Sequence, residues 1–221
     1  RVFEIARVFR KQADGSVQQP EVIAGLAHGS RVDEQWGSKA ERVDFYDIKA
    51  DVEALLYPRV AEYRKAAHPA FHPGRCAEVL LGGAVVGVLG ELHPQWVQAY
   101  GLTNAPVLFE LAVEAVEQVG RVQLAPVSKF QPVRRDLALV VAEDVSAAAI
   151  QLAMKAAASA FVRELALFDV YRGKGVDEGK KSLAFRIVLQ ATDRTLVDDE
   201  VEQAVAAMLA AAQAAGAVLR A

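Results

Sequence analysis

Hydrophobic and polar residues alternate most regularly between residues 181 and 190. One side of the extended chain would carry four large apolar residues, Leu183, Phe185, Ile187 and Leu189. The other side would carry mostly small or polar residues, including Arg186. A period of two predicts a half-buried strand with one face in a core. The pattern does not by itself show what the second face contacts.

Further elements follow from the pattern around this strand. We predict, in order, strand 135–142, helix 146–159, strand 162–171, strand 181–190, helix 198–214 and a short strand 217–220. Ser146 is a suitable N-cap for the first helix, and Gly216 is placed to end the second. The order βαββαβ is that of the ferredoxin-like fold. Both helices should cover one face of the sheet and leave the other face open.

The first half of the chain has a different pattern. It predicts a hairpin over 2–29, a helix over 44–57, a loop over 66–75, a hairpin over 77–92 and a strand with a helical turn over 105–116. Asp44 can cap the helix and Pro58 ends it. The class is α+β, with an antiparallel sheet module first. Two prolines and little periodicity predict a linker, so we expect domains at 1–120 and 135–221 joined by 121–134.

Charge changes this picture only locally. The net charge of −3 gives no overall nucleic-acid signature, but residues 172–194 hold six basic against three acidic residues. Such a patch can bind phosphate, or it can be a solvated loop, and charge alone leaves both open. No apolar run approaches about 20 residues, so no membrane segment is expected. The chain starts at Arg1 directly before a predicted strand, which suggests the C-terminal part of a longer protein.

Catalytic and cofactor motifs are missing from the sequence. The segment 173–182 resembles a phosphate loop, but Lys174 stands where glycine is needed and Lys181 where Ser or Thr is needed. His68 and His72 are separated by a proline, which makes a helical zinc site implausible. Cys76 is the single cysteine and excludes an internal disulfide. We therefore assign no catalytic, cofactor-binding or metal-binding residue.

RNA recognition by an open sheet needs basic groups for phosphates and planar groups for stacking. Phe168 fits a core position better than a stacking position. The candidates for RNA contact are Phe130, Arg134, Arg135, Tyr171, Arg172, Lys174, Lys180, Lys181, Arg186 and Arg194.

Two long segments in the second half resemble a known family. KFQPVRRDLALVV and FDVYRGKGVDEGKKSLAFRIVLQATDRTLVDDEVEQAV are similar to the ferredoxin-fold anticodon-binding domain that closes the β subunit of bacterial phenylalanyl-tRNA synthetases. Upstream, VFEIARVF, DFYDIKADVEALL, HPGRCAEV and VGVLGELHP resemble the last part of the same subunit's catalytic-like module, which has a class II synthetase-like sheet. The resemblance covers the whole chain.

This resemblance implies a role and partners. The family uses ATP and Mg²⁺ to attach phenylalanine to its tRNA in a cytoplasmic (αβ)2 assembly, and its catalytic site lies in the α subunit. The β module is degenerate, and here Gly90-Glu91 is followed by Leu92 instead of arginine. The fragment itself would hold no cofactor and would bind the anticodon arm of the phenylalanine-specific tRNA.

An alternative class of function is a ferredoxin-like regulatory module that binds a small molecule such as an amino acid. Such a module would favour a glycine-rich turn between the first strand and helix, and the turn at 142–148 has no glycine. Relatives usually have threonine where this chain has Val197, so we expect Thr195 or Asp198 to cap the last helix.

Overall fold

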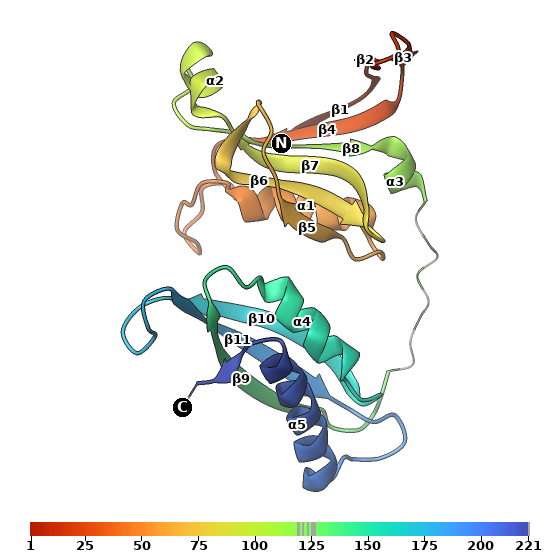
Figure 1. The fold of residues 1–221 in the computed structure, drawn as a ribbon, viewed down its shortest axis with the longest axis vertical. Helices are drawn as coiled ribbons and strands as arrows, with labels where there is room; N and C mark the ends of the chain where they lie inside the picture. The colour runs from red at the N-terminus through yellow and green to blue at the C-terminus, as the bar shows by residue number, and fades with distance from the viewer. Residues whose placement is uncertain (119, 121, 123, 125–126, 221) are drawn as a thin grey trace. The chain divides into compact units, whose positions relative to one another are not determined.

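The computed structural model describes residues 1–118, 120, 122, 124 and 127–220. The chain divides into two compact units, Arg1–Gln123 and Leu124–Ala221, which are coloured red to green and green to blue in Figure 1. Each unit has a buried apolar core of its own. No helix among the described residues is long and apolar enough to cross a membrane.

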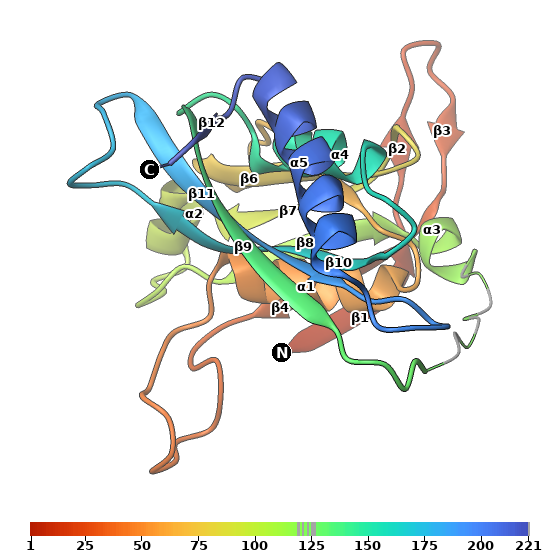
Figure 2. The ribbon, with the colours of Figure 1, turned by 90° about the horizontal axis from the view of Figure 1, so that it is seen from below.

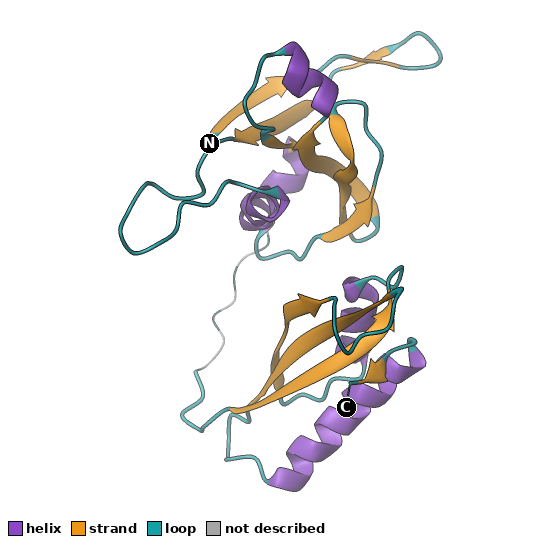
Figure 3. Cartoon of the chain, turned by 90° about the vertical axis from the view of Figure 1, so that its left-hand side faces the viewer, coloured by secondary structure: helices purple, strands orange, loops and turns teal. Residues whose placement is uncertain are grey.

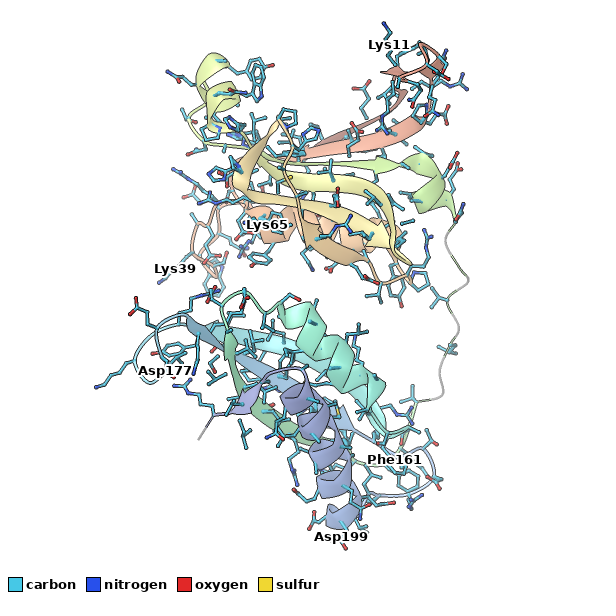
Figure 4. All side chains as sticks on the ribbon, in the orientation of Figure 1. Lys11, Lys39, Lys65, Phe161, Asp177 and Asp199 are labelled. Atoms are coloured by element: carbon cyan, nitrogen blue, oxygen red, sulfur yellow. The ribbon has the colours of Figure 1, made fainter. Side chains whose placement is uncertain are left out.

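The first unit is built on a six-stranded antiparallel sheet. Its strands, in spatial order, are β1 (Val2–Arg7), β4 (Glu21–Ala27), β8 (Val107–Ala112), β7 (Ala84–Leu92), β6 (Phe71–Leu81) and β5 (Glu62–Lys65). Between β1 and β4 the chain extends into a small ribbon, β2 (Arg10–Lys11) and β3 (Val17–Gln18). Figure 4 labels Lys11 near the tip of this ribbon. The predicted hairpin over 2–29 is thus confirmed and carries an extra arm.

Helix α1 (Phe45–Leu56) covers one face of this sheet. The Asp44 carboxylate accepts hydrogen bonds from the backbone N–H groups of Tyr46 and Asp47, and the Asp47 carboxylate accepts one from the Asp44 N–H. This reciprocal pair is a capping box, and it fixes the helix start that the sequence predicts. The helix buries Ile48, Val52 and Leu56 in the core of the unit.

The sequence analysis misses one strand of the first unit and places one boundary wrongly. The missed strand is β5, which is short and charged and has no periodic signal. Strand β6 begins at Phe71, inside the segment 66–75 that was expected to be a loop. Its pairing with β7 is irregular between Phe71 and Cys76, which lets Pro73 lie in a strand without breaking a regular ladder. Two short helices, α2 (Pro94–Ala99) and α3 (Val113–Glu117), complete the unit.

The second unit has the predicted ferredoxin-like order. Its elements are β9 (Val133–Ala142), α4 (Ala147–Ala156), β10 (Val162–Tyr171), β11 (Lys180–Leu189), α5 (Asp198–Ala214) and β12 (Val218–Leu219). The sheet order is β10-β11-β9-β12, and every pairing is antiparallel. Strand β9 starts at Val133, two residues earlier than predicted. Figures 2 and 3 show both helices on the same face of this sheet.

The alternation in β11 matches its burial. Leu183, Phe185, Ile187 and Leu189 are all fully buried. They pack with Ile150 and Met154 of α4 and with Met208 of α5 in one core. The helices therefore cover the apolar face of the sheet, and the face that carries Arg186 has no helix over it.

The N-terminus of α5 differs from the expectation. Val197 occupies the N-cap position, so the expectation that Thr195 or Asp198 would cap the helix is wrong. A valine side chain has no hydrogen-bond acceptor, and only the return half of a capping box exists. In that half, the Glu200 carboxylate accepts a hydrogen bond of 3.1 Å from the Val197 N–H. The first turn is stabilised mainly by its acidic residues, which suit the positive end of the helix dipole.

Candidate nucleic-acid interface

The helix-free face of the second unit is defined by strand register. Arg186 on β11 lies opposite Asp136 on β9 and Ala166 on β10, and Ser182 lies opposite Tyr171. Directly opposed residues in antiparallel strands point to the same face. The central strand thus brings a guanidinium group to this face, and β10 contributes an aromatic ring, whereas Ser182 is buried.

A β-bulge in β10 adds a second ring. Leu167 pairs with Phe185 and Asp169 pairs with Ala184, which leaves Phe168 as the extra residue. The Phe168 side chain is 50% exposed, and the Arg186 guanidinium lies 4.8 Å from its ring centroid. The interpretation of Phe168 as a core residue is therefore wrong. Phe168 continues the alternation of Ala166, which faces Arg186, and therefore lies on the helix-free face; the bulge then brings Asp169 and Tyr171 to the same face.

The other ring, that of Tyr171, lies at the end of β10. Its hydroxyl donates a hydrogen bond of 3.3 Å to the backbone carbonyl of Lys174. The Arg220 guanidinium lies 5.2 Å from the ring centroid, and the Arg220 N–H is bonded to the Ala138 carbonyl at 2.8 Å. Arg220 was not among the predicted site residues. Its only sequence signal is a basic residue beside a short terminal strand, which does not identify an aromatic partner.

Most of the predicted basic residues have carboxylate partners. The pairs are Arg172 with Glu143 at 2.6 Å, Lys180 with Asp177 at 2.9 Å, Arg186 with Asp136 at 3.1 Å and Arg194 with Glu200 at 2.5 Å. The hydrogen bond from Arg186 is the main cause of the lowered pKa of the Asp136 carboxyl. The hydrogen bond from Arg172 has the same effect on the pKa of the Glu143 carboxyl. The basic excess at 172–194 is thus partly neutralised within the unit. Exposed pairs of this kind are weak, so a phosphate can compete with the carboxylate for the same cation.

Two of the predicted cations lie on the opposite side of the sheet. Arg135 is opposite the buried Ile187, and its guanidinium is 3.6 Å from the Glu202 carboxylate of α5. Lys181 is opposite Val141 and donates to the Glu143 carbonyl at 2.7 Å. The structure therefore does not bring these two residues to the helix-free face.

The remaining predicted residues lie at the two ends of the sheet. At one end, Gln190 donates to the Phe130 carbonyl at 2.5 Å, and Arg134 lies opposite Val188 on the helix-free face. Arg194 lies at the same end, 5.6 Å from the ring centroid of Phe161, which is labelled in Figure 4. At the other end, Lys174 is exposed in the loop between β10 and β11. The figure places Asp177 in this loop as well.

No group of three or more His, Cys, Asp or Glu side chains within the described residues is arranged to hold a metal ion. The lone thiol, Cys76, is buried, and burial raises its pKa. The arrangement in the second unit offers exposed rings for stacking and polar groups for hydrogen bonding.

Comparison with known proteins gives matches over both units. Residues 128–220 match the family model described as "Ferredoxin-fold anticodon binding domain", and residues 1–113 match "Phenylalanyl tRNA synthetase beta chain CLM domain". The chain belongs to the phenylalanyl-tRNA synthetase β chain family. The resemblance inferred from the sequence is thereby confirmed, and the small-molecule sensor alternative has no support.

Relatives in this synthetase family match the chain from end to end. The phenylalanine–tRNA ligase β subunit of Chromobacterium violaceum is 63% identical over 220 residues, covering 100% of this chain. Those of Neisseria meningitidis serogroup A and Dechloromonas aromatica are each 50% identical, also over 100% of the chain. In each case the match occupies 28% of the relative, so the chain spans about a quarter of the length of these synthetase subunits.

Proposed function

We propose that this chain is a tRNA-binding, non-catalytic part of a phenylalanine–tRNA ligase β subunit. In this proposal the second unit binds the anticodon arm on its helix-free sheet face. One observation carries it: Phe168 and Tyr171 are exposed on that face, and each ring has a guanidinium group against it. The description of the matching family model, an anticodon-binding domain, supports the same ligand.

The chemistry of the face suits single-stranded RNA. Unstacked loop bases stack on aromatic rings and on arginine planes, and they hydrogen-bond through their edges. The Phe168–Arg186 and Tyr171–Arg220 pairs supply both kinds of planar group. Asp169 pairs in register with Ala184 on the same face and offers acceptor oxygens to base edges. The site would thus read an anticodon loop by stacking first and by hydrogen bonds second.

Phosphate contacts would come from the edges of this face. Arg134 and Lys174 are exposed there, at opposite ends of the sheet. Arg172, Lys180 and Arg194 would have to exchange a carboxylate for a phosphate, which is feasible because their pairs are exposed. Arg135 and Lys181 lie on the helix side, so we propose that they contribute at most from outside the stacking surface.

The rest of the assignment follows the family. We propose that residues 1–120 form the end of a degenerate catalytic-like module, joined through 121–134 to the anticodon-binding domain. The ligase would act in the cytoplasm with an α subunit in an (αβ)2 heterotetramer, and ATP and Mg²⁺ would bind elsewhere in that assembly. By resemblance to the family, adenylate formation takes place in the α subunit, so we assign no step of it to this chain.

The test is the affinity of the 221-residue chain for phenylalanine tRNA, measured by fluorescence anisotropy. Stacking is worth about 1–3 kcal/mol per base, so Phe168→Ala and Tyr171→Ala should each weaken binding about fivefold to 150-fold. Phe9→Ala and Tyr100→Ala are matched controls, because both rings are exposed in the first unit. Equal losses in the controls, or none in the two test variants, would contradict the proposal.

A second measurement separates the anticodon arm from the rest of the tRNA. An isolated anticodon stem-loop should compete with the whole tRNA for the chain, and an acceptor-stem hairpin of equal length should compete more weakly. If the two hairpins compete equally, the contact is with phosphates of any helix and the anticodon assignment is wrong.

A further inference from the structure

The guanidinium group of Arg186 contacts a carboxylate and an aromatic ring at the same time. Its Nε and Nη2 atoms each donate a hydrogen bond of 3.1 Å to a different oxygen of Asp136. The same group lies over the Phe168 ring, 4.8 Å from the centroid. Arg186 on the central strand thus connects a carboxylate of β9 with a ring of β10.

The register of the sheet brings these three groups together. Asp136, Arg186 and Ala166 are directly opposed across β9, β11 and β10. The methyl side chain of Ala166 fills little space beside Arg186, which leaves room for the ring of Phe168 two residues further along β10. A free arginine side chain has many rotamers, and a two-point hydrogen bond to a carboxylate selects one orientation of its planar group. Asp136 therefore orders the guanidinium before a ligand binds, which lowers the entropic cost of binding.

The charges of the pair favour the same arrangement. The hydrogen bond from Arg186 is the main cause of the lowered pKa of Asp136, and the hydrogen bond to Asp136 is the main cause of the raised pKa of Arg186. Both groups are therefore charged at neutral pH, and their charges cancel locally. An arginine held by a carboxylate attracts a phosphate less strongly than a free arginine does, but its planar face can still stack on a base.

We propose that Asp136 is a positioning residue of the RNA-binding face. It holds the Arg186 guanidinium over the Phe168 ring, so that the two planar groups form one stacking platform for a loop base. This inference rests on the proposed function and adds to it a residue that acts through Arg186. Without the carboxylate, the guanidinium would leave the ring and follow the RNA phosphates. Loss of Asp136 should therefore weaken the contact with bases and strengthen the contact with the backbone.

Abasic RNA separates these two kinds of contact. The anticodon stem-loop of phenylalanine tRNA, and the same hairpin with its loop bases removed and its phosphates kept, are titrated with the 221-residue chain by fluorescence anisotropy. The ratio of the two affinities measures what the bases contribute. This ratio should fall about fivefold or more in Asp136→Asn, because stacking contributes about fivefold to 150-fold per base. An unchanged ratio would overturn the proposal.

The salt dependence provides a readout that a merely structural role would not move. In Asp136→Asn, the slope of log affinity against log salt should become steeper by about 0.7, since the released guanidinium gains one single-strand phosphate contact. Glu78→Gln is the matched control. Glu78 lies directly opposite Arg64 on an adjacent antiparallel strand of the first unit and accepts two hydrogen bonds from its guanidinium. The control should change neither the affinity ratio nor the slope, and an unchanged slope in Asp136→Asn would contradict the release of Arg186.

A double-mutant cycle tests whether Asp136 acts through Arg186. Asp136→Asn in an Arg186→Ala background should change the affinity ratio by less than about twofold, because the arginine that it positions is absent. The full effect in that background would mean that Asp136 contacts the RNA itself, and the positioning role would be wrong. The pair is exposed and contributes little to stability, so both variants should fold, which far-ultraviolet circular dichroism checks.

Phe168→Ala distinguishes failure of this inference from failure of the proposed function. If Phe168→Ala weakens RNA binding while Asp136→Asn leaves both the ratio and the slope unchanged, the RNA-binding face stands and the positioning role is wrong. If neither variant changes RNA binding, the proposed function and this inference are both wrong. Weaker binding in Phe168→Ala, together with a lower ratio and a steeper slope in Asp136→Asn, supports both.

Discussion

Both units cover one face of an antiparallel sheet with helices, but their opposite faces differ in chemistry. In the first unit, Glu78, Val88 and Glu110 form one row across three strands. Arg64 pairs with Glu78 at 2.7 Å and Arg10 pairs with Glu110 at 2.8 Å, so this face is crossed by ion pairs. In the second unit, the comparable face carries aromatic rings with guanidinium groups against them.

The difference shows that an uncovered sheet is not in itself a binding surface. The row formed by Glu78, Val88 and Glu110 holds no aromatic ring, so it offers no stacking surface to a base. Exposed rings offer stacking to any base, and the arginines beside them attract the backbone. The side chains on the face, and not the layer arrangement, therefore distinguish a nucleic-acid platform from a structural surface.

The largest effects are expected from substitutions that disrupt the hydrophobic core of only one unit. Phe185→Ala in the second unit and Leu89→Ala in the first should each destabilise their own unit by about 3–5 and 2–5 kcal/mol, since both side chains are fully buried. Denaturant unfolding followed by amide exchange should show one unit lost and the other intact. Only Phe185→Ala should abolish tRNA binding. Loss of binding with Leu89→Ala at a denaturant concentration where the second unit is folded would refute the comparison.

Charge on the two faces gives a smaller effect. Arg134→Ala should weaken tRNA binding about tenfold, and the slope of log affinity against log salt should fall by about 0.7, as expected for one lost single-strand phosphate contact. Glu110→Gln in the first unit is the control and should change neither quantity. If the salt slope stays the same in Arg134→Ala, the assignment of this arginine to a phosphate is wrong.

The first helix of the first unit and the last helix of the second unit are capped differently, and a cap changes the free energy of unfolding by about 1 kcal/mol. Helix α1 has a complete capping box, so Asp44→Ala should lower the stability of the first unit by about 1 kcal/mol. Helix α5 has only the Glu200 half, and Val197 has the extended φ of −90° and ψ of 158° that a capping residue needs. Val197→Ser should therefore raise the stability of the second unit by about 1 kcal/mol. A decrease in its urea midpoint would show that the valine side chain contributes packing that outweighs the missing acceptor.

The smallest expected effect is a change in one carboxyl pKa. The Arg186 hydrogen bond holds the pKa of Asp136 below its ordinary value in the folded chain. This pair therefore stabilises the fold above the unfolded pKa of about 3.9, and the contribution is lost as pH falls through the lower folded pKa. In Arg186→Ala, carboxyl-carbon NMR should show the Asp136 pKa rising. The pKa of Asp14, lowered mainly by the Ser16 hydroxyl, should not move.

Elements with a long, regular pattern could be predicted from the sequence. The strand centred on Phe185 and the helix Asp198–Ala214 both follow from the spacing of their apolar residues, because this spacing can be read within each segment alone. The split of the basic residues between two faces could not be predicted from charge. Arg134 and Arg135 are neighbours in the chain, and the register with β11 places Arg135 on the helix side.

The ring of Phe168 was missed for a related reason. Alternation places residues three apart on opposite faces, so Phe168 and Tyr171 could not both be assigned to one surface. The ion pairs were also hidden, because Glu143 and Arg172 are 29 positions apart. The face of each ring and the ion pairs depend on contacts between elements that are distant in sequence. The local pattern of a single sequence does not reveal such contacts.

The bulge at Phe168 limits which changes of sequence this strand can accept during evolution. Because one extra residue keeps two rings on the same surface, the length of the segment between Leu167 and Tyr171 matters more than the identity of its members. A conservative exchange at Phe168 would leave Tyr171 in place. An added residue between Phe168 and Tyr171 would shift Tyr171 by one position and turn its ring to the helix side. Insertions between these two rings should therefore be tolerated far less than substitutions.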